Sequence, residues 1–310
     1  MGVRFRRPRY EDLTAEWLSE LEALGKSAET LRAYRSDLKL WHESGLDPRS
    51  YLLTLSAAGA RPATVNRRRA ALTVYHAWLV DRGYADENPA EQTKGVKGSR
   101  RMHRTLTVAE VTRLIDGAAQ LGTRGDRPAG VVEQLGHLPI EFYRARLAAM
   151  IALEVTAGLR VSEVCQVRVD NIDLDRRTVR VIRKGDKEQQ LRFGMAAKRR
   201  IEEWLRFRSI TGSTDGYLFC TEDALTAVTP KTYSRQLKEA CWYAGIDPIH
   251  PHVLRHTFAT LAIGSGIPVA DVQQMLGHES VVTTMMYVNR HPDRGFDRYE
   301  SHPLEGELDG

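Results

Sequence analysis

Apolar residues recur at helical spacing through most of the first ninety residues, and this periodicity limits the fold more than any other feature. The segment 10–25 places its large apolar side chains along one helix face, at Leu13, Trp17, Leu18, Leu21 and Leu24. The segment 27–43 repeats this pattern, and DPRSYLLTLSAAG and PATVNRRRAALTVYHAWLVDRG predict a third and a fourth helix. The sequence therefore predicts a small all-helical domain within residues 1–92.

A basic, glycine-bearing and aperiodic stretch, KGVKGSRRMHR, follows this bundle. We assign residues 93–104 to a linker and residues 105–310 to a second domain. Helical patterns dominate the second domain, but TVRVI alternates polar and apolar residues, and a Gly-Asp turn then leads into QQLRF. This order predicts a β-hairpin. The expected fold class is mainly α with a small β-sheet, in which the second domain is α+β.

Cysteine content and hydropathy indicate a cytoplasmic protein. Cys165, Cys220 and Cys241 form no CxxC pair, which is typical of structural thiols in a reducing compartment. No apolar run reaches the length of a membrane span, and the basic N-terminus lacks the apolar stretch of a signal peptide. We expect no contact with a membrane.

Basic residues gather in clusters although the net charge is only +5. The N-terminal arm is arginine-rich, and two further clusters supply candidate DNA-binding residues: Arg67, Arg68, Arg69, Lys94, Lys97, Arg100, Arg101 and Arg104. A single cluster of this kind is usually solvated surface. Three clusters in one half of the chain favour contact with a phosphate backbone.

His252 and His256 have the i, i+4 spacing of a metal-binding helix. Arg255 lies on the same helix face as His252, however, and would hold a fixed positive charge beside any metal ion. The sequence also lacks an HExxH motif, and we expect neither a metal nor a cofactor. Histidine and arginine gathered without carboxylates suit an anion.

Arg160 can join this anion site. Gly158 can end one helix, and Arg160 then falls at the first turn of the next, where free N–H groups and the helix dipole favour a phosphate. Glu163 is three residues further on and could brace the guanidinium group by an ion pair. As an isolated feature, the same pattern would indicate only a surface arginine in an ion pair.

Lys184 falls at or beside the predicted hairpin turn, from which it could donate a proton to a departing alkoxide. Lys187 and Arg183 are close enough in sequence to take the same role. Spacing alone does not choose among the three.

His278 and Tyr287 are nine positions apart and would point in opposite directions on one unbroken helix. Gly277 is a natural end for the preceding helix, so a break there could let both side chains face one cavity. A tyrosine on a helix usually packs in the core. With arginine, histidine and lysine side chains gathered nearby, its phenol could instead attack a phosphodiester and form a covalent phosphotyrosine.

The motifs TAGLRVSEV, VIRKGDKEQQ, HVLRHTFATL, LGHES and TTMMYV, in this order, resemble the tyrosine recombinase (phage integrase) family, in its Xer-like and simple integrase branch. The segments ETLRAYRSDLKLW and TVNRRRAAL resemble the core-binding, SAM-like helical domain of that family. The resemblance implies a site-specific DNA recombinase that cleaves and rejoins strands through a 3′-phosphotyrosine. ATP is not needed, because the phosphotyrosine keeps the energy of the broken phosphodiester. The resemblance also implies that no metal or cofactor is required.

The resemblance also implies which residues hold the scissile phosphate. Arg160 and Arg255 match the two arginines that clamp it, and His278 matches a residue that hydrogen-bonds to it.

Three further positions match residues that move protons or attack the phosphorus. Tyr287 matches the nucleophile, His252 matches the histidine that handles the proton of the nucleophile, and Lys184 matches the general acid toward the leaving 5′ hydroxyl, ahead of Lys187. His256 has no such match, and we expect it to be structural.

The partners implied are double-stranded DNA recombination sites, on which family members assemble as tetramers; carriage by a mobile element is one possible setting. Two alternatives stay open. A type IB topoisomerase-like enzyme shares the cleavage chemistry but would not join two different DNA molecules. A non-catalytic DNA-binding protein would lack one of the catalytic residues, and none is missing from the sequence.

Overall fold

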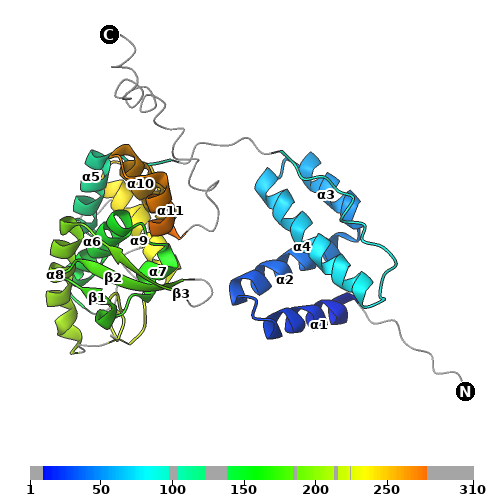
Figure 1. Cartoon of the computed structure of the whole chain (residues 1–310), viewed down its shortest axis with the longest axis horizontal. Coiled ribbons are helices and arrows are strands. Elements are labelled where there is room, and N and C mark those ends of the chain that lie inside the picture. Colours follow the sequence, from blue (N-terminus) through cyan, green and yellow to red (C-terminus); the bar gives the residue numbers. More distant parts are fainter. Residues whose placement is uncertain are drawn as a thin grey trace, which may run out of the picture. The chain divides into compact units, whose positions relative to one another are not determined.

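The computed structural model describes residues 10–97, 104–122, 138–183, 187–212, 216–223 and 225–277. The chain divides into two compact units, Met1–Arg101 and Met102–Gly310 (Figure 1). Each unit is described by itself below.

The described part of the first unit is the predicted helical bundle, with helices α1 (Tyr10–Ala23), α2 (Ala28–Ser44), α3 (Pro48–Ala57) and α4 (Pro62–Asp81). Trp17 is buried in its core, where its ring stacks on Tyr34 and contacts Tyr75, with 5.2 Å between ring centroids in both pairs. Ser27 and Asp47 cap the N-termini of α2 and α3 by accepting backbone N–H groups. The four predicted helices are confirmed.

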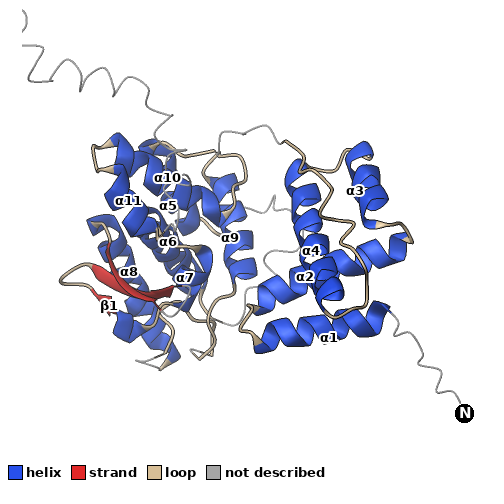
Figure 2. Ribbon diagram, turned by 45° about the vertical axis from the view of Figure 1, so that its right-hand side comes forward, coloured by secondary structure: helices blue, strands red, loops and turns tan. Residues whose placement is uncertain are grey.

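The second unit is built around α6 (Ile140–Ala157), of which 14 of 18 residues are buried. Such a helix is apolar on all sides and must be surrounded by other elements. It packs against α5 (Val108–Ala119), α8 (Met195–Arg208), α9 (Pro230–Tyr243) and α10 (Pro251–Gly264). Figure 2 shows these helices grouped together, with the small sheet at one side of them.

The sheet described in this unit has three antiparallel strands in the order β1 (Ile172–Asp173), β2 (Thr178–Arg183) and β3 (Lys187–Arg192). Val179, Val181 and Leu191 face the core, and Arg183 pairs in register with Lys187. The predicted hairpin is confirmed. The expected fold class, mainly α with a small β-sheet, is confirmed with it.

Two shorter helices border the candidate site: α7 (Val161–Gln166) and α11 (Val269–Leu276). Gly158 ends α6 at a φ of 66°, and Gly277 ends α11 at a φ of 62°. Both values lie in the left-handed region that glycine adopts without strain. The helix ends predicted from these glycines are confirmed. The remaining described elements are short 3-10 turns at Val169–Asn171 and Ser209–Thr211.

Among the described helices, none combines the length and the apolar character needed to cross a membrane.

Candidate active site

Three guanidinium groups from three different elements surround the carboxylate of Glu163 in the described part of the chain. Arg160, at the start of α7, places Nη1 2.7 Å from Oε1. Arg183 at the end of β2 places Nε 3.6 Å from Oε1, and Arg255 in α10 places Nη1 3.9 Å from Oε2. Three positive groups share one carboxylate, so these pairings leave an excess of positive charge. The brace predicted for Arg160 by Glu163 is confirmed.

Arg255 is the most deeply buried of these three arginines and is only 2% exposed. Its Nη1 donates to the carbonyl of Gly158 at 2.8 Å, and its Nη2 donates to the carbonyl of Leu276. These carbonyls lie at the C-terminal ends of α6 and α11, where the helix dipoles favour a cation. Contacts to two helix ends and a carboxylate fix the orientation of this guanidinium group before any ligand arrives.

Arg160 is the more exposed arginine, with 38% of its side chain accessible. Its backbone N–H donates to Oε2 of Glu163 at 2.7 Å, and its Nη2 donates to the carbonyl of Gly277 at 3.2 Å. The same carboxylate therefore orients both the main chain and the side chain of Arg160. A guanidinium group that is oriented by such hydrogen bonds and is also open to solvent can bind an anionic ligand.

A second carboxyl group, that of Glu154, lies in the core near this cluster. It is fully buried and accepts a hydrogen bond of 2.7 Å from the hydroxyl of Tyr233. Burial raises the pKa of Glu154 well above its ordinary value, against the smaller opposing effects of Tyr233 and Arg255. Burial therefore opposes a negative charge on Glu154 that would offset the arginines.

His252 is exposed on α10, less than one turn before Arg255, whereas His256 is buried. The two imidazole rings form an edge contact with centroids 4.6 Å apart. Within the described segments, no group of three His, Cys, Asp or Glu side chains is placed to hold a metal ion.

Lys184, His278 and Tyr287 lie outside the described residues, so their predicted roles stay predictions. Arg183 and Gly277, which immediately precede Lys184 and His278, lie close together at the site. Arg183 donates from Nη2 to the carbonyl of Met275 at 2.8 Å, and a Cβ atom added to Gly277 would collide with the same guanidinium group. The positions from which the chain continues to 184 and to 278 are therefore in direct contact.

Arg183 belongs to the anion site, although from the sequence it was expected only as a substitute for Lys184. The alternation along β2 contained the missing signal, because Val179 and Val181 face the core and Arg183 follows on the same face. Burial lowers the pKa of the Arg183 guanidinium, and the neighbouring Glu163 opposes that shift.

The predicted DNA-binding arginines of the bundle make contacts within their own unit. Arg67 is ion-paired with the buried Asp37, and Arg68 donates to the hydroxyl of Tyr51 at 2.6 Å. Arg69 donates to the carbonyl of Thr93.

The first residues assigned to the linker are also bound to the bundle. Asn66 exchanges two hydrogen bonds of 2.9 Å with the backbone of Val96. The exposed side chains of Lys94 and Lys97 are thereby carried next to α4. Arg104 donates to the carbonyl of Asp247 in the second unit, and Arg100 and Arg101 lie outside the described residues.

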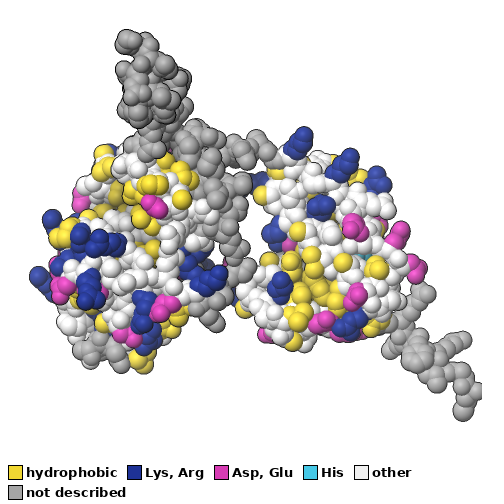
Figure 3. Space-filling view, in the orientation of Figure 1, with side chains coloured by type: hydrophobic (Ala, Val, Ile, Leu, Met, Phe, Trp, Pro, Cys, Tyr) yellow, Lys and Arg dark blue, Asp and Glu magenta, His cyan; other side chains and the backbone are white. Residues whose placement is uncertain are grey.

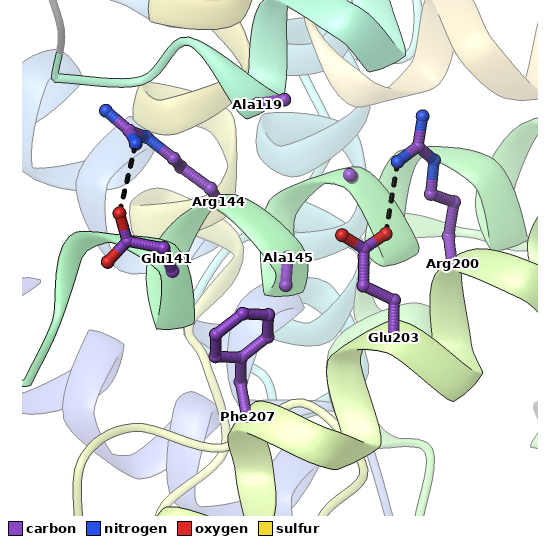
Figure 4. A pocket seen from close by; sticks show the side chains of 8 residues that line it. Ala119, Glu141, Arg144, Ala145, Arg200, Glu203 and Phe207 are labelled. Atoms are coloured by element: carbon purple, nitrogen blue, oxygen red, sulfur yellow. Dashed lines mark hydrogen bonds and ion pairs between the residues drawn. The ribbon is translucent and has the colours of Figure 1, made fainter.

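A pocket of about 190 Å³ lies elsewhere in the second unit, between α5, α6 and α8 (Figure 4). Its charged residues are already paired with each other, Arg144 with Glu141 and Arg200 with Glu203, and the rest of its lining is apolar. It shares no residue with the arginine cluster.

Comparison with families of known proteins matches residues 129–294 to the phage integrase family. This chain belongs to the phage integrase family. The match includes each of the six residues to which the sequence analysis gave catalytic roles: Arg160, Lys184, His252, Arg255, His278 and Tyr287.

Curated relatives of this phage integrase family member include tyrosine recombinases named XerC. The protein of that name from Corynebacterium efficiens is 31% identical over 291 residues, which cover 90% of this chain and 87% of that protein. The XerC protein of Pseudomonas aeruginosa is 28% identical and covers 92% of this chain and 93% of its own length. The predicted Xer-like tyrosine recombinase family is confirmed, and so is the predicted enzyme class, a tyrosine-type site-specific recombinase.

Solved structures support the fold. The XerH site-specific recombinase bound to a palindromic difH substrate aligns with a TM-score of 0.69 at 21% identity, over 87% of this chain and 79% of that chain. A lambda integrase dimer bound to a COC′ core site aligns with a TM-score of 0.66 at 19% identity, over 88% of this chain and 96% of that chain. The predicted helical bundle and α+β second domain of a tyrosine recombinase are confirmed by this likeness.

Proposed function

We propose that Arg160 and Arg255 bind the scissile phosphate of a DNA strand while Tyr287 attacks its phosphorus atom. The observation that carries this proposal is the cluster in which three guanidinium groups share the single carboxylate of Glu163. A phosphodiester under attack accumulates charge on its equatorial oxygens, and guanidinium groups offer paired donors that match this geometry. The donors are already oriented, so little reorganisation accompanies the reaction.

In the proposed cleavage step, the phenol oxygen of Tyr287 bonds to phosphorus and the bond from phosphorus to the 5′ oxygen breaks. His252 accepts the phenol proton, and Lys184 gives a proton to the leaving 5′ oxygen. His278 donates a hydrogen bond to the phosphate. The product is a 3′-phosphotyrosine and a free 5′ hydroxyl, and a second 5′ hydroxyl reverses the step without ATP. The guanidinium groups supply the positive charge, so the proposed step requires no metal ion.

The proposed partner is double-stranded DNA at recombination sites, on which four copies of the chain assemble. The solved relatives include a recombinase bound to a difH substrate and an integrase dimer bound to a core site. Under this proposal the protein works in the cytoplasm, where such DNA is found.

We propose that the bundle contacts the phosphate backbone through its exposed basic residues, Arg67, Lys94 and Lys97. Arg68 donates a hydrogen bond to Tyr51, and Arg69 donates one to the carbonyl of Thr93. These bonds stabilise the part of the bundle that carries the exposed basic side chains. In Figure 3, most Lys and Arg side chains on the visible face of the bundle lie over the part occupied by α3, away from most of the acidic ones. Such a distribution suits a polyanion on one side of the unit.

The test begins with the DNA site, which can be recovered by sequencing DNA crosslinked to the protein in cells. A half-site suicide substrate made from that sequence releases a short 5′ end by diffusion, so rejoining is prevented. The wild-type protein should form a DNA adduct that resists denaturant, and Tyr287→Phe should form none while it still binds the duplex. An adduct formed by Tyr287→Phe would contradict the assignment of the nucleophile.

A type IB topoisomerase-like activity is separated by a second substrate. Two labelled duplexes of different length that carry the recovered site should yield recombinant duplexes of new lengths. Relaxation of supercoiled plasmid without any such joining would contradict the recombinase.

A further inference from the structure

Arg183 occupies the last described position of β2, immediately before Lys184. The strand register pairs it with Lys187, at the point where the described part of β3 begins. Its side chain nevertheless turns away from solvent and is only 7% exposed. A buried guanidinium group at the end of a strand needs partners, because an unpaired buried charge is costly.

The partners of Arg183 lie in two other elements. Its Nη2 donates to the carbonyl of Met275 in the last turn of α11, at 2.8 Å, and its Nε lies 3.6 Å from the carboxylate of Glu163 in α7. The negative end of the α11 dipole favours a cation at this place. In Figure 1, α7 and the end of α11 lie at the same side of the sheet as the ends of β2 and β3 that approach the turn.

The apolar anchoring of the hairpin stops before the turn. Val181 and Leu191 are buried, at 5% and 4% exposure, whereas Ile182 is 66% exposed. Polar side chains add to this anchoring. Arg183, beyond Val181, bonds to Met275, and Gln189, which pairs with Val181, donates from Nε2 to the carbonyl of Gln274 at 2.8 Å. Both bonds end on the last turn of α11.

Helix α11 is a fixed support for these bonds. Val272 and Leu276 are fully buried and pack with Ala259, Ala262 and Ile263 of α10. The same α10 carries Arg255, whose Nη2 also bonds to the end of α11. The hairpin end is therefore tied to the element that positions the phosphate-binding arginine.

We propose that Arg183 is a positioning residue that holds the ends of β2 and β3 against the C-terminal end of α11 during strand cleavage, and so fixes the position from which the chain continues to Lys184. This role rests on the proposed function, in which Lys184 protonates the leaving 5′ oxygen. Misplacing a catalytic group by about 1 Å can slow a reaction about 100-fold. Loss of the Arg183 contacts releases one side of the hairpin and should move the proton donor by a distance of this order.

A change of leaving group distinguishes a residue that positions the proton donor from a residue that only stabilises the fold. An alkoxide leaves slowly without a proton, because the pKa of a hydroxyl is near that of water and far above neutral pH. A thiolate leaves readily without one, because the pKa of a thiol is about 8.5. Replacing the bridging 5′ oxygen by sulfur therefore removes the need for a proton donor, while the attack by the tyrosine and the hold on the phosphate stay the same.

The experiment compares single-turnover cleavage of two suicide half-sites that differ only in oxygen or sulfur at the scissile 5′ position. Arg183→Met keeps the length of the side chain but removes its donors and charge. It should cleave the oxygen substrate about 10- to 100-fold more slowly than wild type, and the sulfur substrate within about threefold of wild type. Lys184→Ala should show the same selective rescue. Arg183→Lys should be intermediate, since an ammonium group can reach one partner but not two.

Arg180→Gln is the matched control, because Arg180 is a half-exposed arginine on the same strand. It should cleave both substrates at the wild-type rate. Thermal unfolding shows whether each variant is folded, and Gln189→Ala, which removes the second bond to α11, provides a milder variant if Arg183→Met is not. Gln189→Ala should also cleave the oxygen substrate more slowly than wild type and the sulfur substrate at the wild-type rate.

Equal slowing of both substrates by the folded Arg183 and Gln189 variants would overturn the inference, because the residue would then act on the phosphate or on the nucleophile. Unchanged rates on both substrates would overturn it as well. Failure of the wild-type protein to form an adduct with either substrate would instead contradict the proposed function.

Discussion

The two units each contain an arginine cluster built on a buried carboxylate, and the two clusters differ in what their arginines can still do. In the bundle, Asp37 is 1% exposed and lies between Arg67 and Arg68, and Arg68 also donates to Tyr51. In the second unit, Glu163 lies among Arg160, Arg183 and Arg255. The first cluster ties helices of the bundle together, and the second gathers three guanidinium groups around one carboxylate.

In the second unit, backbone carbonyls at helix ends hold two of the three arginines in place. Arg255 and Arg183 are held by carbonyls at the ends of α6 and α11, so their positions do not depend on the carboxylate alone. Helix ends can hold arginines with partial charges and leave most of the full positive charge available to an anion. Arg68 contributes to packing within the bundle, whereas we propose that arginines of the second unit bind a phosphate.

The largest expected effect follows from Arg255. Arg255→Lys keeps the charge but cannot reach both helix-end carbonyls while offering donors to a phosphate. Adduct formation on the suicide half-site should fall by about 100- to 1,000-fold, with duplex binding within a few-fold of wild type. Rapid-quench measurement of the adduct tests this. A loss below about threefold would show that the guanidinium group does not hold the phosphate.

The two carboxylates should respond differently to neutralisation. Glu163→Gln leaves three buried or half-buried guanidinium groups without their shared partner and should lower the free energy of unfolding of the second unit by about 3 kcal/mol. Adduct formation should fall at least about 10-fold as the arginines separate. Urea unfolding followed through fluorescence, together with the adduct assay, measures both.

Asp37→Asn is the matched variant in the bundle. It should leave single-turnover cleavage by the DNA-bound protein unchanged. Equal loss of cleavage in Glu163→Gln and Asp37→Asn would show that the two clusters do not differ in their effect on strand cleavage.

The exposed lysines near the bundle should affect DNA affinity rather than stability. Lys94→Gln and Lys97→Gln each remove one phosphate contact and should lower the slope of log affinity against log salt concentration by about 0.9 per residue. Arg68→Gln should instead lower the stability of the bundle by about 1 kcal/mol, because it loses a hydrogen bond to Tyr51. Fluorescence anisotropy with labelled duplex at several salt concentrations tests the slopes. A larger slope change in Arg68→Gln than in the lysine variants would contradict this division.

The smallest expected effect is on pH dependence. Desolvation raises the pKa of Asp37 above its ordinary 3.8, although the arginines oppose the shift. A carboxyl group whose pKa is raised by folding binds its proton more tightly in the native state, so its contribution to stability is full below pH 3.8 and declines as pH rises through the folded pKa. The free energy of unfolding of wild type minus that of Asp37→Asn should therefore decrease with rising pH across this window. Titrated urea unfolding checks the sign, and an increase would show that the ion pairs outweigh burial.

The sequence predicted the parts of the molecule that depend on local pattern. Helical periodicity fixed α1 to α4, the glycines at 158 and 277 ended their helices where expected, and the i, i+3 spacing of Arg160 and Glu163 produced the predicted ion pair. Each of these features is decided within a few residues of chain.

The features that the sequence did not predict depend on tertiary contacts. Asp37 meets Arg67 across 30 residues, and Arg183 meets Met275 across 92. Nothing in the local pattern distinguishes an arginine that will contact a buried carboxylate from one that will contact solvent. The roles given to Lys184, His278 and Tyr287 came from the family resemblance and stay predictions.

The most direct test of the central claim is the structure of the covalent adduct with a suicide half-site. The account predicts a phosphate bonded to the phenol oxygen of Tyr287, with its non-bridging oxygens about 2.8 Å from guanidinium nitrogens of Arg160 and Arg255. An adduct whose phosphate lies away from both arginines, or on another residue, would contradict it.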